Sequence, residues 1–326
     1  MHPAFSVILL TTLIGVGQGL FLAIYTSQLY ALARLLPMPD HQRFFALGSA
    51  VAVGFLVLGL FASFFHLGRP ERAWRSAARW RTSWLSREVI LLPLVVMLVA
   101  AYGLIHGLGW TRPLFVIRGA LPVDASLLVG ALATVAVFAL FVATGMIYAS
   151  IRFLREWASP LTVFNFILLG GASGFTLAAA FSAWVGSGPT RFYGTWAVIL
   201  TVAGAVTRLA SLYRNARLAP KSTLQSAIGV RHPRIRQITQ GAMGRTFNNR
   251  EFFHGASPRT IAAVRWFFLL AVFAIPVALL ATAYVLSSVW IPAAAFAVQY
   301  AGLVAERWYF FADARHPQNL YYQQVA

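Results

Sequence analysis

Two titratable side chains, His66 and Glu88, stand at the two ends of a polar stretch between two long apolar runs. Six arginines lie between them: Arg69, Arg72, Arg75, Arg79, Arg81 and Arg87. A histidine and a carboxylate at a water–lipid boundary can take up and release protons beside a lipophilic substrate. The pair therefore predicts proton chemistry on a membrane-soluble molecule, and His66 suits a hydrogen bond to a quinone carbonyl or a proton relay.

Both residues also have interpretations without chemistry. His66 would then be an ordinary interfacial histidine, and Glu88 a first-turn acid that complements the helix dipole after a cap at Ser86. Three tryptophans interleave with the arginines of the stretch: Trp74, Trp80 and Trp84. They indicate either an interfacial aromatic belt or a segment that lies flat on the membrane and covers a lipid-accessible pocket.

A second carboxylate, Glu306, falls beside Arg307 inside a predicted membrane span. A charge at that depth is costly unless it is paired or functional. We therefore expect a structural ion pair between Glu306 and either Arg307 or an arginine of another helix.

The composition is that of an integral membrane protein. Hydrophobic residues make up 59% of the 326 residues and charged residues only 10%, against about 25% charged in an ordinary soluble domain. The net charge of +18 indicates basic loops rather than nucleic-acid binding, since no nucleic-acid motif accompanies it. Cysteine is absent, which excludes disulfides, thiolate zinc sites and cysteine-ligated iron–sulfur clusters within this chain. The first residues lack a basic n-region, so we expect no cleaved signal peptide.

Eight segments are apolar over the roughly 20 residues that a helix needs to cross a bilayer. Their expected limits are 5–33, 44–66, 88–108, 124–149, 161–185, 194–213, 260–287 and 290–311. The predicted fold is an all-α polytopic integral membrane protein of eight transmembrane helices packed as helical bundles. We expect a single membrane-anchor domain over residues 1–326.

The basic residues predict the orientation of the chain. The odd-numbered loops hold five of them: Arg34, Arg43, Arg112, Arg118 and Arg191. The even-numbered loops, their helix ends and the C-terminal end hold the other 21 of 26. The positive-inside rule then places both termini and the basic loops, about 67–87 and 214–259, in the cytoplasm of a bacterial inner membrane. The longer loop is either a solvated connection or a docking surface for an acidic partner or for lipid phosphates.

A haem between helices would need two axial nitrogens at one depth. His66 ends the second predicted span and His106 ends the third, so the two lie on opposite sides of the membrane and cannot share one iron. This argument disfavours a dihaem cytochrome.

The stretch from Phe64 to Glu88 resembles the signature of the DMSO reductase membrane-anchor subunits, the DmsC type. In that family a His-Leu-Gly-x-Pro turn is coupled to a Ser-x-Glu helix start, as in 66–70 and 86–88 here. Residues 246–254 and 305–316 are also similar to the family, and the resemblance covers essentially the whole chain.

The resemblance implies a subunit that anchors a four-cluster iron–sulfur protein and, through it, a molybdopterin catalytic subunit. It implies electron exchange with ubiquinone or menaquinone and no haem or iron–sulfur cluster in this chain. The family's quinone site matches His66 and Glu88, which would carry the quinone-linked protons, with Arg69, Trp84 and Arg87 beside them. The remaining basic residues of the two loops are candidates for partner docking: Arg72, Arg75, Arg79, Arg81, Arg245 and Arg250.

The direction of electron flow stays open at this point. The ending from His316 to Gln324 resembles the anchors of cytoplasm-facing sulfite dehydrogenases, which pass electrons from sulfite oxidation to the quinone pool. The alternative within the family is the anchor of a reductase of dimethyl sulfoxide or a related acceptor. The alternative from another class is a secondary transporter, which would show broken helices at matching positions, for which only Gly170-Gly171 and Pro276 are candidates.

Overall fold

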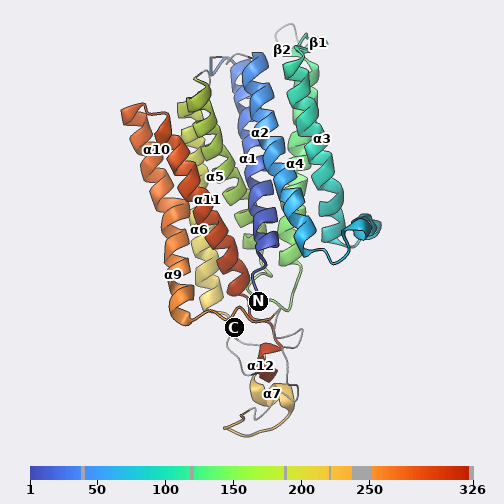
Figure 1. Ribbon diagram of the computed structural model, residues 1–326, viewed down its shortest axis with the longest axis vertical. Helices are drawn as coiled ribbons and strands as arrows, with labels where there is room; N and C mark the ends of the chain where they lie inside the picture. The colour runs from blue at the N-terminus through green and yellow to red at the C-terminus, as the bar shows by residue number, and fades with distance from the viewer. Residues whose placement is uncertain (38–40, 118–120, 187–188, 220–221, 237–251, 323–326) are drawn as a thin grey trace.

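The computed structural model describes residues 1–326 except 38–40, 118–120, 187–188, 220–221, 237–251 and 323–326. The described chain is a bundle of long helices (Figure 1). These are α1 (Phe5–Leu32), α2 (His41–Ser63), α3 (Trp84–Gly107), α4 (Ala125–Ala149), α5 (Pro160–Val185), α6 (Thr190–Ala216), α9 (Pro258–Leu269), α10 (Ile275–Leu286) and α11 (Trp290–Ala312). The all-α prediction is confirmed.

Seven helical segments among the described residues are long and apolar enough to cross a membrane. One of them is α9 and α10 joined by the π-helical turn η3 (Leu270–Ala274) into a span of 29 residues, Pro258–Leu286. The eighth predicted span forms the 23-residue helix α11. Gln299, Glu306 and Arg307 lie within it and lower its hydropathy.

The short elements lie at the two ends of the bundle. At the end that carries both termini are the 3-10 segments η1 (Phe64–His66) and η2 (Pro70–Arg79) and the short helices α7 (Leu224–Ile228) and α12 (Asn319–Tyr322). At the other end, a hairpin of β1 (Phe115–Ile117) and β2 (Leu121–Val123) pairs antiparallel with Phe115 opposite Val123. The hairpin was not predicted, since its strands have only three residues each.

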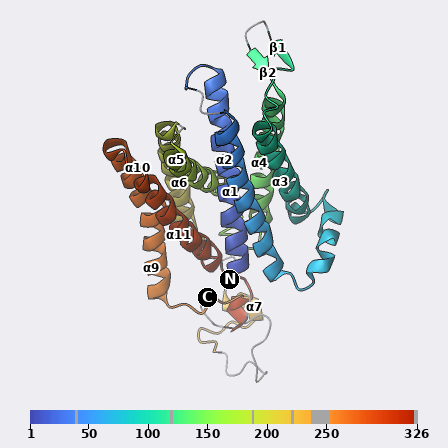
Figure 2. The ribbon, with the colours of Figure 1, turned by 45° about the horizontal axis from the view of Figure 1, so that its top comes forward.

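Helices α1 and α5 form the centre of the bundle and are the most buried of the apolar helices. Helix α1 packs against α2, α5 and α11, while α2, α3 and α4 lie to one side and α6 and α9–α11 to the other (Figures 1 and 2). Helix α5 runs through Gly170 and Gly171 without a break.

Glycines let α1 and α5 touch backbone to backbone. Gly15 and Gly19 on α1 face Gly170 and Gly174 on α5, so each helix has two glycines one turn apart at the contact. A Cβ on Gly19 would overlap the carbonyl of Gly170, and one on Gly174 would overlap the backbone of Gly19 and Leu20. This small-residue contact is the way in which membrane helices approach closely when lipid supplies no hydrophobic drive.

The helix caps correct one prediction. Asp124 caps α4, since its Oδ1 accepts from the Leu127 N–H at 2.9 Å. Helix α3, however, begins at Trp84, and its cap is Ser83, whose hydroxyl accepts from the Ser86 N–H at 3.3 Å. The expectation that Ser86 is the cap was wrong by about one turn. Glu88 therefore lies in the second turn of α3, and its interpretation as a first-turn dipole acid fails.

His66 and His106 lie at opposite ends of the neighbouring antiparallel helices α2 and α3, as predicted. His106 is fully buried, with its ring 4.8 Å from that of Phe45 and 4.7 Å from that of Tyr102. The two histidines therefore cannot ligate one iron.

The segment after α11 is held against the bundle by His316. The His316 ring stacks on Phe252 at 3.8 Å and meets the edge of Phe153 at 5.5 Å. Burial lowers the pKa of His316 below its ordinary value, and the nearby N-terminal amine lowers it further.

Acidification is expected to loosen this segment. Because the folded-state pKa of His316 is depressed, the unfolded chain binds more protons as pH falls through the ordinary histidine value of about 6.5, and the packed state loses stability there. Hydrogen exchange of residues 314–322, corrected for intrinsic rates, should be faster at pH 5.5 than at pH 7.5. His316→Phe should remove this pH dependence, whereas His232→Phe, at an exposed histidine, should leave it intact. Equal pH dependence in the two variants would contradict the attribution of this effect to His316.

Candidate functional site

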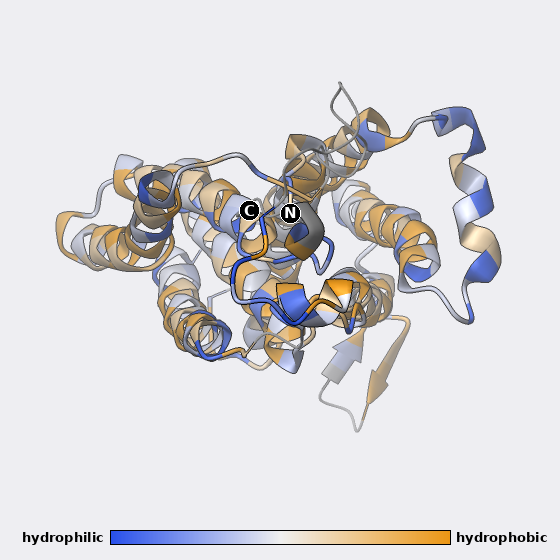
Figure 3. Cartoon of the chain, turned by 90° about the horizontal axis from the view of Figure 1, so that it is seen from below, coloured by the Kyte–Doolittle hydropathy of each residue, from blue (hydrophilic) through white to orange (hydrophobic). Residues whose placement is uncertain are grey.

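The basic stretch between α2 and α3 folds as a short arm beside the bundle. Helix α2 ends in η1, and Pro70 then opens η2, which stands apart from the other helices at the end that carries both termini (Figures 2 and 3). The arm exposes four of the predicted docking arginines: Arg72, Arg75, Arg79 and Arg81. We call these residues, with Trp74 and Trp80, the η2 arm. The two other docking candidates, Arg245 and Arg250, lie outside the described residues.

Arginine–tryptophan stacking shapes the η2 arm. The guanidinium of Arg75 lies 5.5 Å from the ring centre of Trp74, and that of Arg81 lies 5.3 Å from that of Trp80. Trp74 is 71% exposed and Trp80 53%. Exposed indole rings beside cations suit the headgroup layer of a membrane, where an apolar body and a polar edge are both solvated.

Arg87 joins the arm to α3. Its guanidinium lies 4.0 Å from the Trp84 ring centre and donates to the carbonyls of Trp80 at 3.0 Å and Arg81 at 2.9 Å. Arg87 and Trp84 thus fix the turn that leads into the helix carrying Glu88. Arg69 is exposed at the start of η2.

Glu88 points into the bundle rather than toward water. It is 7% exposed, and its Oε1 accepts a hydrogen bond from the Thr144 hydroxyl of α4 at 2.5 Å. Tyr148, one turn further along α4, packs against Phe166 and Phe310. Among the described residues no other side chain is hydrogen-bonded to the Glu88 carboxylate, so its second oxygen is available to a ligand or to water.

His66 is exposed at the last turn of the α2–η1 segment. Within the described chain, no hydrogen bond joins His66 to Glu88. The structure thus brings the predicted pair to the same end of two neighbouring helices but not into direct contact. Phe61 and Phe65, on the same segment as His66, are exposed and lie edge to face at 5.3 Å.

The expected ion pair of Glu306 is confirmed, and its closest partner comes from another helix. Arg208 of α6 places Nε 2.8 Å from Glu306 Oε1, and Arg307 places Nη2 3.6 Å from Oε2. Arg208 was not among the predicted site residues, nor was Thr144. Their only signal in the sequence is a lone polar residue within an apolar run, which does not identify a partner.

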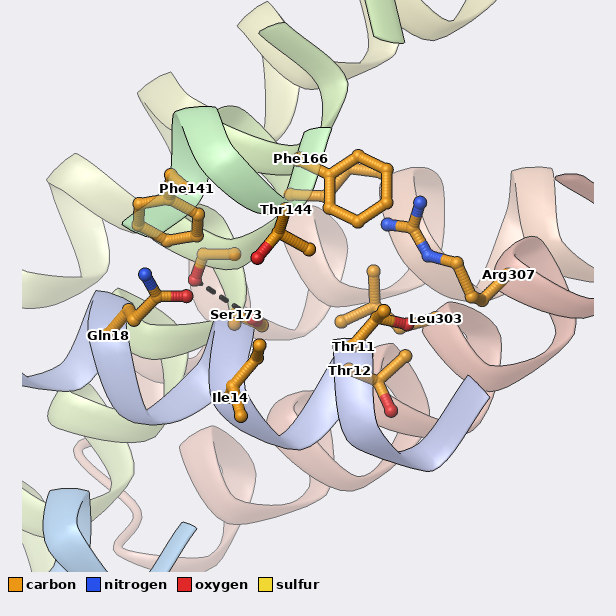
Figure 4. A pocket seen from close by; sticks show the side chains of 13 residues that line it. Thr11, Thr12, Ile14, Gln18, Phe141, Thr144, Phe166, Ser173, Leu303 and Arg307 are labelled. Carbon is orange, nitrogen blue, oxygen red and sulfur yellow. Dashed lines mark hydrogen bonds between the residues drawn. The ribbon is translucent and has the colours of Figure 1, made fainter. Parts of the chain in front are cut away.

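A small internal cavity lies between α1, α4, α5 and α11 (Figure 4). Its volume of about 10 Å³ is close to the minimum that holds one water molecule. Six side chains give it a polar lining: Thr11, Thr12, Gln18, Thr144, Ser173 and Arg307. Thr144, the hydrogen-bond donor to Glu88, and Arg307, the neighbour of Glu306, thus line one cavity.

Comparisons with known proteins agree with one another. The sequence model of a family described as DMSO reductase anchor subunit (DmsC) matches residues 1–310. The chain is also 62% identical over 326 residues to a sulfite dehydrogenase subunit of Allochromatium vinosum, and the match covers 100% of both chains.

Proposed function

Because this chain belongs to the family of DMSO reductase anchor subunits, we propose that it is the membrane anchor of a sulfite dehydrogenase complex and passes electrons to quinone. The observation that carries the sulfite assignment is the 62% identity over the full length of both chains. The family description alone supports the opposite direction of electron flow. The chain would then be an anchor that oxidises quinol for a reductase of dimethyl sulfoxide or a related acceptor. A secondary transporter is not supported, since the two candidate positions do not match: a π turn precedes Pro276, whereas α5 is unbroken at Gly170–Gly171.

The electron path requires partners, because this chain has no cysteine to ligate an iron–sulfur cluster. We propose a four-cluster iron–sulfur subunit docked on the basic end of the bundle, and a molybdopterin catalytic subunit that is bound to it in turn. We also propose that this end faces the cytoplasm of a bacterial inner membrane, in line with its excess of arginines. No nucleic acid enters this scheme.

The boundary residues fit a quinone by their chemistry. A bound quinone would supply a two-electron, two-proton acceptor at the edge of the membrane. His66 would donate a hydrogen bond to one carbonyl, while the free oxygen of Glu88 would hold the proton to be transferred. Arg87 and Trp84 would position the start of α3, and the exposed Phe61 and Phe65 would contact the apolar part of the ring and its tail.

The direct test is to purify the complex through a tag on this chain and to measure sulfite-dependent reduction of a short-chain ubiquinone or menaquinone. We expect quinone reduction to require this chain, while sulfite oxidation with an artificial dye does not. A complex that instead uses quinol to reduce S-oxides, and does not oxidise sulfite, would establish the reductase alternative.

The η2 arm is expected to dock the iron–sulfur subunit. Replacing Arg72, Arg75, Arg79 and Arg81 together by Gln removes four exposed positive charges, which should lower co-purification of the partners about tenfold at moderate salt because steering between charged surfaces is lost. A matched control replaces four exposed arginines at the other end of the bundle: Arg34, Arg43, Arg112 and Arg191. Equal loss of partners in both variants would argue against a docking role for the arm.

A further inference from the structure

Four charged side chains are buried within the described membrane helices. They are Glu88 on α3, Arg208 on α6, and Glu306 and Arg307 on α11, exposed by 7%, 3%, 1% and 4%. An isolated charge in this environment costs several kcal/mol, so buried charges in membranes are found paired. Two arginines and two carboxylates sum to zero only if Glu88 is ionised.

Three of these groups form one cluster. Glu306 lies between Arg208 at 2.8 Å and Arg307 at 3.6 Å, which leaves the cluster with a net charge of +1. Aromatic ring faces stabilise part of this excess positive charge. The Arg307 guanidinium lies 3.8 Å from the ring centre of Phe166, and the Arg208 guanidinium lies 5.4 Å from the ring centre of Phe268. Among the described residues, Glu88 is the one other buried carboxylate.

The water-sized cavity lies between one member of the cluster, Arg307, and the hydrogen-bond partner of Glu88, Thr144. Arg307 and Thr144 both line it (Figure 4), and the Thr144 hydroxyl donates to Glu88. The Nε of Arg307 is buried and has no hydrogen-bond partner among the described residues. A water in the cavity could accept from this Nε and donate to the lone pairs of Thr144, Gln18 or Ser173, which gives it the two to four partners that a buried water needs.

We propose that Arg208, Glu306 and Arg307 act together as the counter-charge of Glu88, coupled to it through the cavity and Thr144. The three are positioning residues: none need touch the quinone, and their effect is to favour the ionised form of Glu88. The quinone-linked role of Glu88 comes from the proposed function, but the charge coupling itself does not depend on it.

Other groups near Glu88 do not replace this counter-charge. Helix α4 presents Tyr148, which carries no charge at neutral pH. Helix α2 carries His66 at the exposed near end and Arg43 at the far end. The arginines of the η2 arm are exposed and screened by water, and Arg87 is engaged with the backbone of the arm.

The charge of the cluster affects proton transfer at Glu88. When Glu88 takes up a proton, the four buried groups carry a net charge of +1, and release of that proton restores neutrality. The cluster therefore lowers the proton affinity of Glu88 and favours release of a proton that Glu88 has taken up.

The test is a set of charge variants of the cluster in the purified complex in lipid nanodiscs. The readout is the infrared carboxylic C=O band followed as pH is lowered. The band of protonated Glu88 is the one that is absent from Glu88→Gln at every pH, and it reports protonation without turnover. Arg307→Gln makes the cluster neutral and should raise the ratio of protonated to ionised Glu88 at pH 7 by roughly tenfold. Glu306→Gln makes the cluster +2 and should lower that ratio.

The matched control is Arg208→Gln combined with Glu306→Gln. This double variant disturbs the same buried cluster but keeps its charge at +1, so the Glu88 band should stay as in the wild type. A band that moves alike in all three variants, or in none, would overturn the counter-charge. If Arg307→Gln fails to fold, the comparison of Glu306→Gln with the double variant still shows whether the Glu88 band follows the charge of the cluster. Should Glu88→Gln retain full quinone turnover while the band follows cluster charge, the proposed role of Glu88 toward quinone would fail and this inference would stand.

Discussion

Glu88→Gln is expected to lower sulfite-dependent quinone reduction by the complex at least about a hundredfold, the usual contribution of a positioned acid or base. Glutamine keeps the size of the side chain and can accept from Thr144, but it cannot carry a proton. The measurement is steady-state reduction of a soluble quinone, with dye-linked sulfite oxidation measured in the same preparation. The dye-linked rate should stay within about twofold, because it bypasses this chain.

The control for this prediction is Glu71→Gln. Glu71 is a carboxylate of the same basic stretch, but it is exposed on the η2 arm and 3.8 Å from Arg72. Its loss should leave quinone reduction nearly unchanged, since exposed ion pairs contribute little. Full quinone turnover in Glu88→Gln would remove Glu88 from the proton pathway.

Gly174→Val is expected to prevent the bundle from assembling, with a loss of about 5 kcal/mol or more in folding free energy, which is exceptional for a single substitution. A Cβ at this position would overlap the main chain of Gly19 and Leu20, and a main chain cannot rotate away as a side chain can. The measurement is the yield of monodisperse protein and its thermal transition in detergent.

The matched control for the glycine contact is Gly171→Ala on the same helix. A Cβ there meets only the Leu200 Cδ1, at 3.4 Å, which is close to an ordinary van der Waals contact. This variant should fold with a transition within a few degrees of the wild type. If Gly174→Val were equally stable, the close approach of α1 and α5 would not be a determinant of the fold.

Hydropathy predicts the positions of the helices in this protein well, but it does not predict their caps, their local geometry or the helices against which they pack. The apolar runs locate each long helix to within a few residues, because crossing the hydrocarbon layer requires a minimum length of apolar chain. The cap of α3 was missed because Ser83 and Ser86 are both plausible caps, and only the backbone shows which one precedes the helix. The π turn at Leu270–Ala274 leaves no mark in the hydropathy, and its one signal in the sequence is Pro276, which was a candidate break.

At the candidate site too, the sequence indicates which residues are unusual but not which side chains they contact. Glu88 stands out in the sequence because carboxylates are rare in this chain and this one begins a span. That it faces Thr144, and that Glu306 pairs more closely with Arg208 than with adjacent Arg307, depends on helix rotation and packing, which no single sequence displays. The spacing of Gly15 and Gly19 and of Gly170 and Gly174 is visible in the chain, but it does not say which helices meet.

Arg208 is synthesised well before Glu306, the carboxylate with which it pairs. A ribosome that adds about 5–20 residues per second makes α6 roughly 5–20 s before it makes the α11 carboxylate that neutralises Arg208. During that interval Arg208 has no partner from its final cluster. The nascent chain must therefore hold α6 near the translocon, an insertase or the lipid headgroups until its last long helix arrives. A longer delay applies to α1, which waits for both α5 and α11 before its polar face is enclosed.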